Sequence, residues 1–169
     1  MFSGCTSSAQ QSPLPVTEDL DLPRFMGKWY VIANIPTVFE RDAYAATEEY
    51  RWLGEQKVAT TFRYRKGSLD AEWREMNPTA FVDEQRPGVW KMQFVWPFKA
   101  DYRVMYVDDA YTVAIVGREK RDYVWLMARS PQMDAAALDA SIERIAQAGY
   151  DITQLRMIPH PGAPEVAAQ

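Results

Sequence analysis

The fold is decided by residues 89–129, which read VWKMQFVWPFKADYRVMYVDDAYTVAIVGREKRDYVWLMAR. In this stretch apolar and polar residues mostly alternate, in four short segments that brief turns separate. The segments are Val89–Trp96, Tyr102–Asp108, Tyr111–Arg118 and Tyr123–Arg129. A period of two is typical of β-strands, so the stretch predicts four consecutive strands joined by tight links.

The same period extends toward the N-terminus and predicts four earlier strands. They cover Lys28–Ile35, Ala45–Leu53, Lys57–Arg65 and Leu69–Met76, and Ala80–Val82 extends the fourth. Proline or glycine follows each of these strands, and both residue types interrupt regular strand structure.

After residue 129 the apolar period changes from that of a strand to that of a helix. Asp134–Ala148 places three aliphatic side chains on one stripe, which are Leu138, Ile142 and Ile145. Such a stripe is typical of an amphipathic helix, which Ser130 or Asp134 caps and Gly149 ends. A short ninth strand is expected within Ile152–Ile158.

These elements predict an all-β fold. It is an eight-stranded antiparallel up-and-down β-barrel with one C-terminal α-helix packed outside. Residues 1–20 are expected to form a flexible leader, residues 21–160 the barrel and helix, and residues 161–169 a disordered tail. Eight strands enclose an interior that is either filled by side chains or wide enough for one small ligand.

Composition excludes several classes of function. The chain has 169 residues and a net charge of −4, without the basic stripe that nucleic-acid binding requires. It has no apolar run long enough to span a membrane as a helix. With one cysteine and one histidine, it offers no disulfide, no zinc cluster and no catalytic triad. We therefore expect no catalytic residue, no metal and no cofactor.

Strand alternation assigns an inward face that is rich in aromatic side chains. The predicted ligand-binding residues on that face are Glu48, Tyr50, Trp52, Phe62, Tyr64, Trp73, Trp90, Met92, Phe94, Tyr102, Val104 and Tyr106. Rigid apolar side chains with a few phenol groups suit a chain-like lipid. The alternative is a heavily aromatic core that leaves no cavity.

Glu48 is the exceptional member of this set, because it is a carboxylate in phase with Tyr50 and Trp52. An unpaired charge in an apolar interior is costly, so Glu48 either meets the polar end of a ligand or lies in water at the barrel mouth.

The first residues carry a separate signal. Phe2-Ser3-Gly4-Cys5 resembles the end of a bacterial lipoprotein signal, in which the cysteine receives the lipid after cleavage. The polar run that follows would then be a tether. We expect lipidation at Cys5; an incidental cysteine is the alternative.

Three segments of the chain resemble the lipocalin family, in the order and at the spacing that eight strands and a helix require. They are Phe25–Tyr30 with its Gly-x-Trp, Tyr102–Gly117 around the turn of strands six and seven, and Asp122–Pro131 with an arginine that ends strand eight. Ala110 departs from the second motif, where a polar residue is common. Phe39-Glu40-Arg41 and Pro97-Phe98 are closest to the bacterial outer-membrane lipoprotein branch, which is related to apolipoprotein D.

The motif residues are expected to be structural and to close the floor of the barrel. They are Gly27, Trp29, Asp108, Tyr111 and Arg129. Gly27 allows the chain to approach closely, and Trp29 plugs the floor with Arg129 lying over its indole.

The resemblance implies a binding protein and not an enzyme. It implies that a fatty acid or lysophospholipid is stored or transported in the barrel. It also implies that a lipid anchor holds the protein at the periplasmic face of the bacterial outer membrane. The alternatives are a lipid-modifying enzyme of the calycin superfamily, with Glu48 and a tyrosine as acid and base, or a filled barrel that contacts other proteins. A homodimer stays open.

Overall fold

The computed structural model describes residues 11–38 and 40–162. Cys5, Phe39 and the tail from residue 163 therefore lie outside the described residues.

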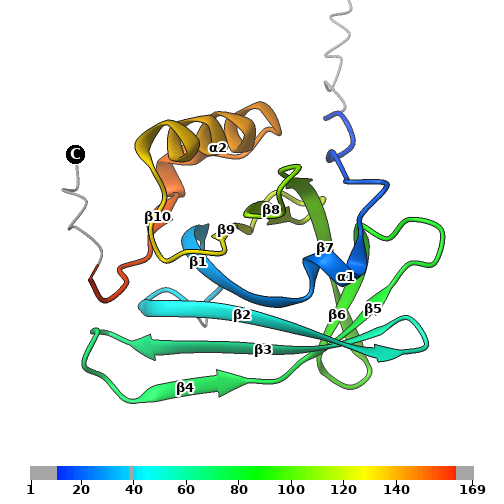
Figure 1. The fold of residues 1–169 in the computed structure, drawn as a ribbon, viewed down its shortest axis with the longest axis horizontal. Helices are drawn as coiled ribbons and strands as arrows, with labels where there is room; N and C mark the ends of the chain where they lie inside the picture. The colour runs from blue at the N-terminus through cyan, green and yellow to red at the C-terminus, as the bar shows by residue number, and fades with distance from the viewer. Residues whose placement is uncertain (1–10, 39, 163–169) are drawn as a thin grey trace, which may run out of the picture.

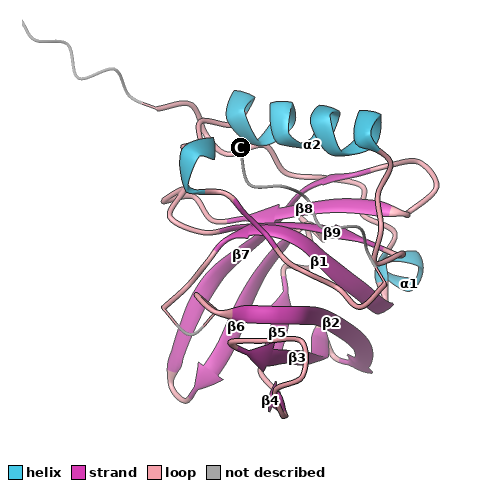
Figure 2. Cartoon of the chain, turned by 90° about the vertical axis from the view of Figure 1, so that its left-hand side faces the viewer, coloured by secondary structure: helices cyan, strands magenta, loops and turns pink. Residues whose placement is uncertain are grey.

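The strands form one antiparallel sheet that closes on itself, because β1 pairs with both β2 and β9 (Figures 1 and 2). The strands are β1 Gly27–Ile35, β2 Ala43–Gly54, β3 Lys57–Lys66, β4 Trp73–Met76, β5 Thr79–Val82, β6 Val89–Val95, β7 Phe98–Val107, β8 Val113–Gly117, β9 Val124–Ala128 and β10 Arg156–Met157. β4 and β5 both pair with β3, on either side of Asn77-Pro78. Counted together as one interrupted strand, they make the barrel eight-stranded. The predicted eight-stranded barrel is confirmed.

Antiparallel pairing sends alternate turns to opposite ends of the barrel. The short helix α1, Leu22–Phe25, lies at the end that holds the turns after β2, β5 and β7. We call this the closed end. The turns after β1, β3, β6 and β8 meet at the other end, which we call the mouth. Sequence reasoning missed α1, although Asp21 caps it and a proline occupies its first turn.

The long helix α2, Ala135–Gln147, packs outside the barrel as predicted (Figure 2). Asp134 caps its start by accepting from the Ala137 amide at 3.0 Å. Gly149 ends it with a φ of +91°, a left-handed conformation that favours glycine. The expected ninth strand is shorter than predicted: a 3₁₀ turn, Ile152–Gln154, leads into the two-residue β10, which extends the sheet beside β1.

The described residues form two apolar cores, one on each side of the barrel wall. The inner core lies inside the barrel, and the outer core lies between the wall and α2, where Ile115, Leu126 and Ile145 are fully buried. Leu14 and Leu20, which belong to the expected leader, are also buried. The Thr17 amide donates to the Val104 carbonyl at 2.8 Å, so this part of the segment lies along the outside of β7.

A bulge in β7 corrects one predicted site residue. The pairing with β8 shifts register between Val104 and Tyr106, so that Met105 and Tyr106 both join the outer core. Tyr106 lies beneath the Arg144 guanidinium of α2, 4.1 Å from the ring centre. The prediction that it faces the interior is wrong, because one extra residue reverses strand alternation.

Candidate functional site

The closed end is sealed by Trp29 and Arg129. The buried Trp29 donates from Nε1 to the Phe25 carbonyl at 2.8 Å. The Arg129 guanidinium lies 3.8 Å above the Trp29 ring. It also donates to four backbone carbonyls of one short segment, and the three shortest bonds are to Arg24 at 2.7 Å, Met26 at 2.8 Å and Lys28 at 2.9 Å. One side chain thereby ties the end of β9 to α1 and the start of β1.

Gly27, Asp108 and Tyr111 shape the backbone around this seal. Gly27 has a φ of +92°, and a Cβ there would lie 3.3 Å from Arg129 Nη1. Asp108 accepts from the amides of Thr112 at 2.6 Å and Val113 at 2.8 Å; although partial burial opposes it, these bonds lower the pKa of the carboxyl. The Tyr111 hydroxyl accepts from the Asp21 amide at 2.8 Å. In this arrangement the three residues make structural contacts.

Above the seal, aromatic rings pack against one another in the lower half of the interior. The ring of Phe25 lies 5.2 Å from Trp29, 5.4 Å from Tyr50 and 5.6 Å from Trp90. Tyr102 stacks on Trp90 at 5.6 Å, and its hydroxyl hydrogen-bonds to that of Tyr50. Burial raises the pKa of both phenols well above its usual range, so both stay neutral. This half of the interior offers an apolar floor.

Eight of the predicted ligand-binding residues lie inside the barrel. They are Glu48, Tyr50, Phe62, Tyr64, Trp90, Met92, Tyr102 and Val104, all of them buried. The other three besides Tyr106 lie elsewhere, and each departs from the prediction for a local reason.

Trp73, Phe94 and Trp52 do not line the interior. Trp73 pairs with Arg65 on the outer face of the barrel, because β4 begins only after a turn. The Arg65 guanidinium lies 4.6 Å from the centre of the Trp73 ring. Phe94 follows a register shift between Met92 and Val95 and is exposed near the mouth. Trp52 keeps its predicted phase opposite Val58, but it lies beside the β2–β3 hairpin at the closed end, where 41% of it is exposed.

Nearer the mouth the interior becomes polar. Glu40, from the β1–β2 turn, folds inward and accepts from Trp125 Nε1 at 3.1 Å and from Asn34 Nδ2 at 3.3 Å. Glu48 is also buried, and its Oε2 has no hydrogen-bond partner among the described residues. Asn34 Oδ1 shares that condition, and so does Thr60 Oγ1 nearer the closed end, where Thr60 pairs with Tyr50. Three buried oxygen atoms can therefore still accept a hydrogen bond. Sequence reasoning noted Glu40 only as part of a family motif, and a turn residue gives no alternation signal of its own.

The two carboxyl groups are coupled through their charges. Burial raises the pKa of Glu48 well above its usual range, and the negative charge of Glu40 raises it further. Burial also raises the pKa of Glu40, against the lowering effect of its hydrogen bonds from Trp125 and Thr37. A neutral Glu48 can donate a hydrogen bond, whereas a charged one attracts a cation, so this region favours a polar group over bare hydrocarbon.

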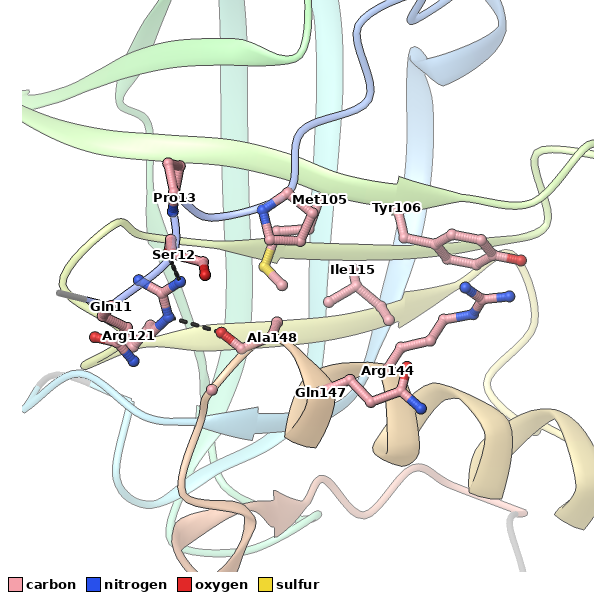
Figure 3. A pocket seen from close by; sticks show the side chains of 12 residues that line it. Gln11, Ser12, Pro13, Met105, Tyr106, Ile115, Arg121, Arg144, Gln147 and Ala148 are labelled. Carbon is pink, nitrogen blue, oxygen red and sulfur yellow. Dashed lines mark hydrogen bonds between the residues drawn. The ribbon is translucent and has the colours of Figure 1, made fainter. Parts of the chain in front are cut away.

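The described residues also line two grooves outside the barrel wall. The first, of about 410 Å³, runs between residues 11–15, β7 and the end of α2 (Figure 3). Arg121 closes one side of it by donating to Ser12 at 2.6 Å and to Ala148 at 2.7 Å. The second, of about 520 Å³, lies beside the mouth between the β1–β2 turn and Arg156. Within residues 11–38 and 40–162, no group of His, Cys, Asp and Glu side chains is placed to hold a metal ion. Neither helix in that part of the chain is long and apolar enough to cross a membrane.

Residues 20–160 match the family model described as a lipocalin-like domain. The outer membrane lipoprotein Blc of Vibrio cholerae is 32% identical over 157 residues, which cover 92% of this chain and 90% of that protein. Apolipoprotein D of Macaca fascicularis is 25% identical, over 89% of this chain and 82% of its own length. Insecticyanin from the tobacco hornworm Manduca sexta has the same fold, with a TM-score of 0.69 at 16% identity over 95% of this chain and 89% of that chain.

Proposed function

The chain belongs to the lipocalin family, in the branch of Blc and apolipoprotein D, and from that premise we propose that it binds and carries a small hydrophobic ligand. The proposed ligand is a fatty acid or a lysophospholipid. The observation that carries the proposal is the layering of the interior, with an aromatic floor below and the unpartnered buried oxygens of Glu48 and Asn34 nearer the mouth. A ligand with an apolar tail and a polar head has the same two parts in the same order.

In this arrangement the acyl chain lies against Trp90, Met92 and Val104, and its head group meets Glu48 and Glu40. Burial of apolar surface at about 25 cal/mol per Å² supplies most of the affinity. The two carboxyl groups discriminate between ligand head groups. A charged Glu48 repels the carboxylate of a fatty acid, whereas the hydroxyl or ammonium group of a lysophospholipid can donate a hydrogen bond to Glu48.

A fatty acid brominated along its chain is expected to quench the tryptophan fluorescence of the protein, because bromine quenches only indoles in contact with it. Trp90→Phe removes one wall of the site and is expected to weaken binding by about 1 kcal/mol, roughly a fivefold rise in Kd. Trp73→Phe, which changes the outer face, is the matched control and leaves Kd unchanged.

Quenching that is absent in the wild-type protein would support the alternative of a filled barrel. Mass spectrometry of the recovered ligand separates carriage from chemistry, since a carrier returns the lipid unaltered and an enzyme of the calycin superfamily does not.

The proposed location is the periplasmic face of the bacterial outer membrane, with the protein anchored through acylated Cys5. The supporting finding is that the relatives in Vibrio cholerae, Escherichia coli and Citrobacter freundii are named outer membrane lipoproteins.

Cys5→Ala, expressed behind a complete lipoprotein signal, is expected to leave the membrane pellet after washing at physiological salt. An acyl anchor with more than one chain resists such a wash, whereas an unacylated protein retains only reversible contacts. The unmodified protein is the control. Retention of the variant in the washed pellet would contradict the anchor.

A further inference from the structure

The β6–β7 hairpin ends in a cluster of exposed apolar side chains, which we call the apolar tip. The tip consists of Phe94, Val95, Trp96 and Phe98, with exposed fractions of 56%, 68%, 82% and 76%. Single exposed apolar residues are ordinary on protein surfaces, but these four lie within five positions at the end of one hairpin, and apolar surface concentrated in this way marks interaction sites.

The apolar tip lies at the mouth of the barrel. The turn after β6 and the turn after β8 share that end, because consecutive antiparallel strands reverse direction. The N-terminal segment is held at the β8–β9 turn, where the Leu14 amide donates to Glu119 at 3.1 Å and Arg121 donates to Ser12. Figure 2 shows the β6–β7 hairpin and this segment on its left-hand side and α1 on its right.

One lysine stands directly beside the apolar tip in the sequence, because Lys99 follows Phe98. The other lysine of the hairpin, Lys91, is paired with Asp101 at 3.2 Å. The ammonium of Lys99 lies 3.5 Å from the centre of the Phe81 ring on β5, and Lys99 has no ion-pair partner among the described residues. Tryptophan and phenylalanine with a neighbouring lysine suit the interface of an anionic bilayer, where rings enter the head-group layer and ammonium groups meet phosphates.

We propose that the apolar tip inserts into the head-group layer of a lipid bilayer and turns the mouth of the barrel toward the membrane. The tip is the end of one hairpin, and four side chains fall short of the roughly 800 Å² per partner that a stable protein interface buries. A bilayer needs no matching pocket, so a protruding tip suits it better than it suits a second copy of the chain.

The place of Cys5 in the sequence agrees with this orientation, in a step that rests on the proposed anchor. Five residues lie between Cys5 and Gln11, so a fully extended chain separates the two by at most about 20 Å. An acylated Cys5 therefore holds the β8–β9 turn, and with it the mouth, close to the bilayer surface.

The test uses the Cys5→Ala protein, so that no anchor contributes, with vesicles of phosphatidylethanolamine and phosphatidylglycerol at about 3:1. We expect the protein to float with the vesicles at equilibrium. The double variant Trp96→Ser/Phe98→Ser is expected to reduce the bound fraction by roughly tenfold, since it removes the two most exposed rings. Trp52→Ser/Leu53→Ser is the matched control, because it removes two exposed apolar side chains at the closed end.

Equal flotation of the tip variant and the control would overturn the proposal. A sedimentation-velocity shift from dimer to monomer in the tip variant, without vesicle binding by the parent, would assign the tip to a second copy instead. Kd for fatty acid is measured without vesicles in the same proteins. If Kd is unchanged and no protein floats with the vesicles, only the membrane-docking proposal is contradicted. If no protein binds the fatty acid, the carrier function is contradicted.

Discussion

Arg129→Ala is expected to lower the free energy of unfolding by about 3 kcal/mol. The substitution removes three short hydrogen bonds to backbone carbonyls, together with the contact over the Trp29 ring. Charge-assisted hydrogen bonds contribute about 1.5–3 kcal/mol each when buried, and a desolvated cation–π contact about 2. The sum is discounted because the guanidinium is partly exposed to water, which can replace some of these bonds.

Urea unfolding followed by tryptophan fluorescence measures this loss, which corresponds to a fall in Tm of about 6–12 °C for a chain of this size. Arg51→Ala, at an exposed position of β2, is the control and is expected to change stability by less than about 0.5 kcal/mol. Arg129→Lys is expected to lie between the two, because an ammonium cannot reach three carbonyls and lie flat on the indole at once. A loss below about 1 kcal/mol for Arg129→Ala would show that the seal does not hold the barrel closed.

Glu48→Gln is expected to stabilise the protein at neutral and alkaline pH and to leave its stability unchanged near pH 4. The pKa of the buried carboxyl is raised in the folded protein, first by desolvation and then by the charge of Glu40. A raised carboxyl pKa means that the folded state binds the proton more tightly than the unfolded state. The stability that this tighter proton binding gives the wild-type protein is therefore fully present below the unfolded-state pKa of about 4.3. It is lost as the pH rises through the pKa of the folded state.

The measurement is a series of thermal melts from pH 4 to pH 8 for the wild-type protein and the variant. Each kcal/mol gained by the variant appears as about 2–4 °C in Tm. Glu49→Gln is the matched control, because the neighbouring carboxyl faces outward and is exposed. A Glu48→Gln protein whose Tm difference from wild type stays constant across this range would refute the buried, protonatable carboxyl.

Much of the barrel could be predicted from the sequence, since it depends on local pattern. Alternation locates the strands, and the motif residues Trp29 and Arg129 meet as expected at the closed end. The same alternation fails for Tyr106 and Phe94, because each follows a shift in strand register that a period of two cannot reveal. Trp73 fails for a different reason, since the preceding turn is longer than predicted and changes which residues pair.

The candidate site was less predictable than the fold because part of it comes from a turn. Glu40 reaches Trp125, 85 positions away in the sequence, only after the β1–β2 turn folds into the mouth. Nothing in the residues around Glu40 distinguishes a carboxylate that points inward from one in water. Its hydrogen bonds to Trp125 and Asn34 depend on barrel closure, which is a property of the whole chain.

The pairing of β1 with β9 also constrains how the molecule reaches its native state. Tyr30 lies opposite Ala128, so the seam joins two segments almost a hundred positions apart. A ribosome that has released only the first hundred residues exposes an unpaired β1 and one apolar side of a growing sheet. Contacts between residues so distant in sequence slow folding, and they leave strand edges unpaired and prone to aggregation until β9 has been synthesised. For this molecule, C-terminal truncations that remove Val124 and the rest of β9 are expected to aggregate instead of folding into smaller barrels.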